Sequence, residues 1–116
     1  YSIVFSNNIA IDAGSSSTNA LVTLGNCTMC SVIGNTLKRN DDSGANIELG
    51  TITRAIVTGN VCISGTYGLE ITSVTECQHV GNIFNGMATG DTSGSTFAAV
   101  TGHGTGGTAG TMVETT

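Results

Sequence analysis

The chain contains no proline and no tryptophan, and only 9% of its 116 residues are charged. Its permanent cations are Lys38, Arg39 and Arg54, against eight acidic residues, which gives a net charge of −5. A nucleic-acid partner needs a basic surface to neutralise its phosphates, so this composition argues against such a partner. No apolar run approaches the about 20 residues of a membrane-spanning helix. We therefore expect no nucleic-acid partner and no membrane insertion.

The length allows one domain with a single core of modest size. The chain opens on Tyr1, without an initiator methionine or the layout of a signal peptide, so we expect a processed product or a fragment of a longer protein. The surface is predicted to be rich in Thr, Ser, Asn and Gly. That composition is typical of secreted or virion proteins, and it places the chain in a virion or outside the cell.

A short phrase recurs about every 21 to 28 residues along the chain. Its copies read Val32-Ile33-Gly34-Asn35, Val57-Thr58-Gly59-Asn60 and Val80-Gly81-Asn82, with looser copies at Val4-Phe5-Ser6-Asn7 and Val100-Thr101-Gly102-His103. A fixed period in this range, with strand-like residues and no helical periodicity, predicts a solenoid.

Aligning the copies on the asparagine gives columns of one character, as expected where successive strand residues point to opposite faces. The columns expected to point inward are Val4/Val32/Val57/His79/Val100, Ile9/Leu37/Cys62/Phe84, Val22/Ile47/Leu69, Leu24/Leu49/Ile71 and Cys27/Ile52/Val74. We therefore predict three short strands per coil and about four to five coils, with the differences in length placed in turns such as residues 38–44.

These phrases resemble the right-handed parallel β-helix repeat of the pectin-lyase-like superfamily. The resemblance covers residues 1–85, and residues 86–116 are expected to form a Gly/Thr-rich terminal coil or cap of the same domain. It implies an all-β parallel β-helix, a fold that serves polysaccharide lyases and hydrolases, bacteriophage tailspikes and adhesins. Tailspikes of this kind are typically homotrimers that bind or cut surface polysaccharide.

The repeated asparagines are predicted to form a ladder of stacked amides, made of Asn7, Asn35, Asn60 and Asn82. An amide both donates and accepts hydrogen bonds, so identical side chains at strand spacing can bond to each other and to turn backbone. We expect this ladder to be structural rather than a ligand site.

The four cysteines are expected to be buried free thiols, because each falls in an inward column. Cys30 and Cys77 share a column but lie two coils apart, with Ala55 between them, which is beyond disulfide reach. The motif Cys27-Thr28-Met29-Cys30 is a weak metal signal without a second pair. We therefore predict no metal and no cofactor.

Glu48 and Glu70 are the catalytic candidates, because they share an outward column about one strand spacing apart. Carboxyl groups about 5 Å apart suit a retaining glycosidase, and like charges that close would raise the pKa of one of them. The structural alternative is two solvated glutamates or a polar subunit contact. Tyr67 is the nearby aromatic side chain for a sugar. The turn containing Asp41 and Asp42 could also bind sugar, although a solvated turn is the alternative.

Two functions remain from the sequence. The first is a structural and receptor-binding portion of a homotrimeric viral tailspike or fibre, which recognises a host surface glycan. The second is a polysaccharide-degrading β-helix enzyme, a glycoside hydrolase or lyase, or a fragment of one, with Glu48 and Glu70 as its acid and nucleophile. A weaker third option is a bacterial adhesin or filament module.

Overall fold

The computed structural model describes residues 1–11, 18–41, 43–94 and 99–101. Within these residues the chain forms nine β-strands and no helix. The strands are β1 (Ser2–Ser6), β2 (Ile9–Ile11), β3 (Val22–Leu24), β4 (Cys27–Ile33), β5 (Thr36–Lys38), β6 (Ile47–Thr58), β7 (Val61–Val80), β8 (Ile83–Gly94) and β9 (Ala99–Thr101).

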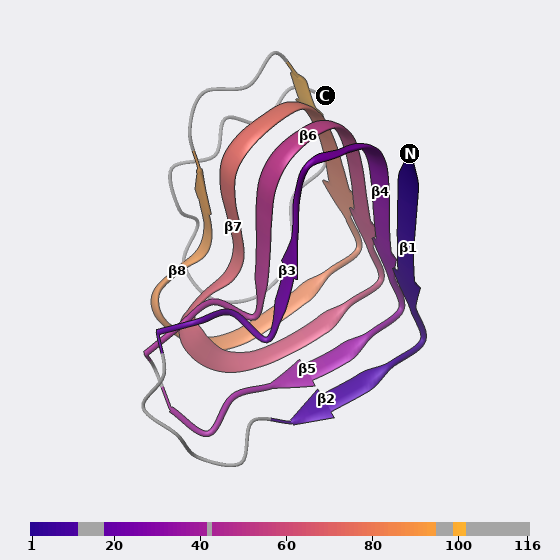
Figure 1. Ribbon diagram of the computed structural model, residues 1–116. Coiled ribbons are helices and arrows are strands. Elements are labelled where there is room, and N and C mark those ends of the chain that lie inside the picture. Colours follow the sequence, from indigo (N-terminus) through magenta and orange to yellow (C-terminus); the bar gives the residue numbers. More distant parts are fainter. Residues whose placement is uncertain (12–17, 42, 95–98, 102–116) are drawn as a thin grey trace.

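The strands form a parallel β-solenoid of about three turns, which confirms the predicted all-β fold class. Each strand pairs in parallel with the strand one coil further along the chain, in the series β1, β4, β6, β7, β9 and the series β2, β5, β7, β8 (Figure 1). The expectation of four to five coils was too high.

The strands are also longer than the three short segments per coil that we expected. β7 runs for 20 residues and turns a corner without leaving the sheet. The corner falls at Ser64 and Gly65, whose φ angles are +57° and +118°. Positive φ bends the chain within a single strand, and glycine adopts it at little steric cost, so no separate turn is needed there.

The core consists of the predicted inward columns. Parallel pairing stacks Val22 on Ile47 and Leu69, Leu24 on Leu49 and Ile71, and Cys27 on Ile52 and Val74. Eight of these nine side chains are buried, and Leu24 is partly buried. Full burial of such a side chain stabilises a fold by about 1.5–3 kcal/mol, so these columns hold the coils together. His79 is also buried, in the column of Val57.

The first coil is shifted by one residue from its predicted alignment. Phe5 and Ala10, rather than Val4 and Ile9, pair with Val32 and Leu37. A shift of one residue moves every side chain to the other face of a strand. Val4 and Ile9 are accordingly 69% and 76% exposed.

The cause of this shift is a doublet of asparagines. Asn7 has a φ of +55° and occupies the corner position that Gly34, Gly59 and Gly81 hold in the later coils, with φ of +66° to +68°. Asparagine adopts this left-handed conformation more readily than most residues. Asn7 therefore replaces a glycine, and Asn8 takes the following position.

The last coil also departs from its predicted alignment. Val100 pairs with Cys77, not with His79, and β8 continues across the expected boundary between residues 85 and 86. The cause is one extra residue in β8 between Met87 and Gly90, opposite Gly65 and Tyr67 of β7, where the register shifts. The shifted register then continues into β9. His103 and most of the expected terminal cap lie outside the described residues.

Candidate functional site

The asparagine ladder occupies one corner of the solenoid and begins at Asn8 rather than at Asn7. The Nδ2 of Asn8, Asn35 and Asn60 donates to the Oδ1 of the next asparagine at 3.2, 2.9 and 2.9 Å, ending on Asn82. Asn35, Asn60 and Asn82 also donate to backbone carbonyls of the preceding coil. These bonds use both amide hydrogens of Asn35 and Asn60, so the inner ladder has no donor left for a ligand.

All four cysteines are buried and free. Burial raises the pKa of the Cys30, Cys62 and Cys77 thiols to about 12. A thiol is a nucleophile or metal ligand only as its thiolate, so these three groups are chemically inert at neutral pH. Among the described residues, no cluster of three or more His, Cys, Asp or Glu side chains is arranged to hold a metal ion.

Glu48 and Glu70 are paired across β6 and β7, in one column with Thr23 and Ser93. Both side chains are half-buried. Partial burial, and secondly the charge of Glu48, raise the pKa of Glu70 above the ordinary range of a glutamate. Tyr67 lies three residues earlier in β7, about 10 Å along the strand from Glu70, and is half-buried opposite Gly90.

Asp41 holds a turn together rather than standing free in solvent. Its Oδ1 accepts hydrogen bonds from the backbone N–H of Ser43 at 3.2 Å and from Arg39 at 3.4 Å. The bonds from Ser43, and then the charge of Arg39, lower the pKa of Asp41. Asp42, the other predicted sugar ligand of this turn, lies outside the described residues.

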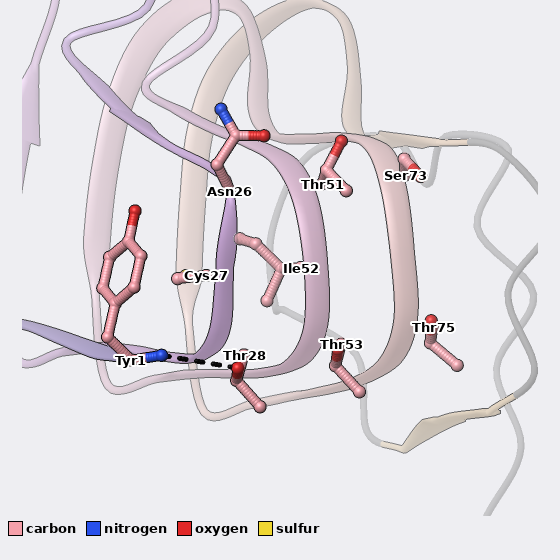
Figure 2. Close-up of a pocket in the computed structure, with 9 residues that line it drawn as sticks. All are labelled: Tyr1, Asn26, Cys27, Thr28, Thr51, Ile52, Thr53, Ser73 and Thr75. Atoms are coloured by element: carbon pink, nitrogen blue, oxygen red, sulfur yellow. Dashed lines mark hydrogen bonds between the residues drawn. The ribbon is translucent and has the colours of Figure 1, made fainter.

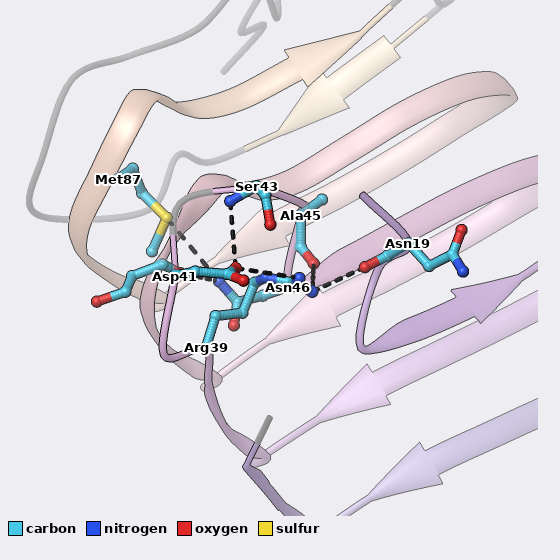
Figure 3. A network of polar contacts seen from close by, with 8 residues as sticks. Asn19, Arg39, Asp41, Ser43, Ala45, Asn46 and Met87 are labelled. Carbon is cyan, nitrogen blue, oxygen red and sulfur yellow. Dashed lines mark hydrogen bonds and ion pairs between the residues drawn. The ribbon is translucent and has the colours of Figure 1, made fainter. Parts of the chain in front are cut away.

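The turn is organised by Arg39, which was not expected to be buried and is only 1% exposed. Its Nη1 donates to the backbone carbonyl oxygens of Asn19, at 2.7 Å, and Ala45, at 3.4 Å (Figure 3). Buried charges need such partners. The two acceptors belong to separate loops, so no local pattern in the sequence predicts the burial of Arg39.

The most regular polar surface is a groove that the sequence analysis missed (Figure 2). Two rows of short polar side chains border its floor, which is formed by Cys27 and Ile52. One row is Asn26, Thr51 and Ser73, and the other is Thr28, Thr53 and Thr75, with Tyr1 beside Thr28 at the end. The groove encloses about 290 Å³.

The signal for this groove was present in the sequence. The triplets Asn26-Cys27-Thr28, Thr51-Ile52-Thr53 and Ser73-Val74-Thr75 each place two short polar residues on either side of a core column. Residues two apart in a strand point to the same face. The core column Cys27/Ile52/Val74 was predicted correctly. The residues immediately before and after each member of that column form the two polar rows of the groove.

A second groove, of about 350 Å³, crosses the outer face of β4, β6 and β7. An ion pair lies in it, joining Arg54 Nε to Glu76 Oε2 at 2.8 Å. Its lining residues are Met29, Arg54, Ala55, Ile56, Glu76, Cys77 and Gln78. Unlike the first groove, it is mainly apolar.

Comparison of the chain with family models, with curated proteins and with solved structures gave no match. The resemblance to the pectin-lyase-like superfamily therefore holds at the level of the parallel β-solenoid. In the part of the chain that the structure describes, no helix is long and apolar enough to cross a membrane.

Proposed function

We propose that this chain is the structural and receptor-binding β-solenoid portion of a homotrimeric viral tailspike or fibre, and that it binds a neutral surface polysaccharide. The observation that carries the proposal is the groove between the row Asn26/Thr51/Ser73 and the row Thr28/Thr53/Thr75. The groove presents equivalent polar side chains on successive coils, so it suits a polymer with a repeating unit.

The chemistry of the two rows matches sugar hydroxyl groups. Hydroxyl and amide side chains both donate and accept hydrogen bonds. They recur at the strand spacing of about 4.8 Å along each row, and the rows lie about 7 Å apart because their residues are two apart in a strand. Tyr1 adds an exposed aromatic ring at the end of the threonine row, with an apolar face and a polar tip.

The electrostatics favour a neutral glycan. No Lys, Arg, His, Asp or Glu side chain lines the groove, so no side-chain cation is available to pair with a uronic acid or a sulfate. The amino group of Tyr1, which donates to Thr28 Oγ1 at 3.4 Å, lies only at the end of the groove. The chain carries a net charge of −5. An anionic polymer would therefore be repelled by the protein as a whole.

Binding to purified neutral and anionic bacterial polysaccharides tests this proposal. Replacing Thr53 and Thr75 together by valine removes two hydroxyl groups and keeps the side-chain shape. With about 1 kcal/mol per hydrogen bond, we expect affinity for the neutral polymer to fall on the order of tenfold or more. Thr36→Val, in the column of Ile9, Val61 and Ile83 and away from both candidate sites, is the control. Equal affinity in all three proteins, or a preference for anionic polymers, would contradict the proposal.

Cleavage of the polysaccharide is the second candidate function, favoured by the stacked pair Glu48 and Glu70 and by the raised pKa of Glu70. A raised pKa suits a general acid, and a close pair suits a retaining mechanism. If the wild-type chain shortens the polymer it binds, Glu48→Gln and Glu70→Gln should each abolish that activity. Unchanged cleavage in both variants would remove these residues from the mechanism.

A further inference from the structure

The side chains of the polar groove keep their hydrogen-bonding groups available to a ligand. The members of its two rows are all exposed; they are Asn26, Thr28, Thr51, Thr53, Ser73 and Thr75. In the part of the chain that the structure describes, Thr28 alone of the six uses its side chain in a hydrogen bond, accepted from the amino group of Tyr1. Two other threonines of the same strands differ, because the hydroxyl groups of Thr58 and Thr72 donate to backbone carbonyls of the neighbouring coil. The two rows therefore present unused donors and acceptors.

The rows of the groove are straight and follow the axis of the solenoid. Cys27, Ile52 and Val74 pair in unbroken parallel register across β4, β6 and β7, so the residues on either side of them stack coil upon coil (Figure 2). The register shift of β7 falls between Gly65 and Tyr67, outside the groove. Successive members of each row therefore lie on one line, about 4.8 Å apart.

We infer that the groove selects a linear, extended glycan, of the kind that β-1,4 linkages between pyranose rings produce, lying along the solenoid axis with one ring on each coil. The inference rests on the proposed binding of a neutral polysaccharide and names the class of chain. Rings joined through equatorial bonds form a straight ribbon, and each ring advances by close to one strand spacing, about 4.8 Å. A chain joined by α-1,4 linkages coils instead, so it leaves a straight row after one or two rings.

The width of the groove also suits a ribbon of sugar rings. The two rows lie about 7 Å apart, so the hydroxyl groups on the two edges of a ring can each reach one row. The faces of the ring carry C–H bonds, and they would lie over the floor formed by Cys27 and Ile52. Tyr1 continues the threonine row beyond Thr28, with its aromatic ring exposed. Three coils and this ring offer positions for about four sugars.

Two glucose hexamers that differ only in their linkage test this inference. They are cellohexaose, with β-1,4 bonds, and maltohexaose, with α-1,4 bonds. Titration calorimetry of the full chain should show cellohexaose binding at least about tenfold more tightly than maltohexaose. In the series from cellobiose to cellohexaose, affinity should rise about fivefold with each ring, because each ring adds hydrogen bonds to one more coil. The rise should end at about four rings, where the groove ends.

A variant in the middle of the threonine row links this selectivity to the groove. Thr53→Val should lower the affinity for cellohexaose about fivefold and change that for maltohexaose little. Thr36→Val, outside the groove, should bind both hexamers as the wild type does. Far-UV circular dichroism verifies that each variant keeps its β-sheet signal.

The outcomes separate this inference from the proposed function on which it rests. Equal affinity for the two hexamers, tighter binding of maltohexaose, or an affinity that does not depend on length overturns the extended chain and leaves the neutral-polysaccharide site standing. Failure to bind either hexamer, by a protein that does bind a neutral bacterial polysaccharide, has the same meaning. A protein that binds neither the hexamers nor any neutral polysaccharide overturns both the inference and the proposed function.

Discussion

At the scale of single residues, the amide of Asn60 connects three coils of the solenoid. Its Oδ1 accepts from the backbone N–H and the Nδ2 of Asn35, and its Nδ2 donates to Val32 and Asn82. Asn60→Ala would leave the buried N–H of Asn35 and the carbonyl of Val32 without these partners. We expect it to lower the free energy of unfolding by about 3 kcal/mol, as measured by urea denaturation.

Asn8 provides the matched control for this prediction. It stands at the exposed end of the ladder, and its side chain donates to Asn35 and to the backbone of Ser6. Solvent can replace these bonds, so Asn8→Ala should cost less than about 1 kcal/mol. Equal losses in the two variants would mean that burial does not set the strength of the ladder.

The thiols give a second prediction at this scale. All four cysteines are buried, and the pKa of three of them is raised to about 12. We expect no reaction with a thiol reagent such as dithionitrobenzoate in the native protein, and four reactive thiols after denaturation. Rapid labelling without denaturant, or fewer than four thiols in the unfolded chain, would contradict the buried, unpaired arrangement.

Glu70 gives a prediction about pH. Its pKa is raised in the folded protein, by burial and by Glu48. Just above the ordinary glutamate pKa, the folded state therefore binds more protons than the unfolded state, and stability falls as pH rises. Glu70→Gln removes this loss. The urea midpoint of the variant minus that of the wild type should therefore increase between about pH 4 and about pH 7. A difference that decreases with rising pH would contradict this prediction.

At the scale of the strands, Gly68 of β7 lies directly against the ring of Phe84 of β8. A Cβ placed on Gly68 would overlap the ring of Phe84, with Cε1 only 2.7 Å away. Phe84 is fully buried and cannot move aside freely. Gly68→Ala should therefore lower the free energy of unfolding by about 1–3 kcal/mol, measured by urea denaturation.

Gly25 is the control for this substitution, because its Cβ would lie 3.6 Å from the nearest atom, the Cα of Gly50. That is an ordinary van der Waals distance, so Gly25→Ala should change stability little. A large loss in both variants would show that the loss does not depend on the overlap with Phe84. A large loss in neither would show that Phe84 can repack.

At the scale of the whole molecule, stability should depend on protein concentration. The proposed homotrimer forms only from folded chains, so assembly would stabilise the fold by mass action. We expect the midpoint of thermal unfolding to rise with protein concentration. Calorimetry at several concentrations measures it. A constant midpoint would contradict the proposed homotrimer.

The chemistry of the site was only partly predictable from the sequence. The stacking of Glu48 on Glu70 followed from counting residues between equivalent strands. The burial of Arg39 did not, because its partners Asn19, Asp41 and Ala45 come from loops with no repeat pattern. The polar groove draws its lining from several coils, and its rows become visible in the sequence only once the strands are aligned.

The sequence by itself determined the parallel β-solenoid and the inward columns of its core. Both follow from local rules, since strand residues alternate between faces and each coil repeats the pattern of the last. Only the tertiary structure decided the alignment of the first coil, where Asn7 and Asn8 offer two choices that differ by one residue. The sequence pattern alone does not distinguish these two alignments. The fold does, because only one of them packs Phe5 instead of Val4 against the core and continues the ladder through Asn8.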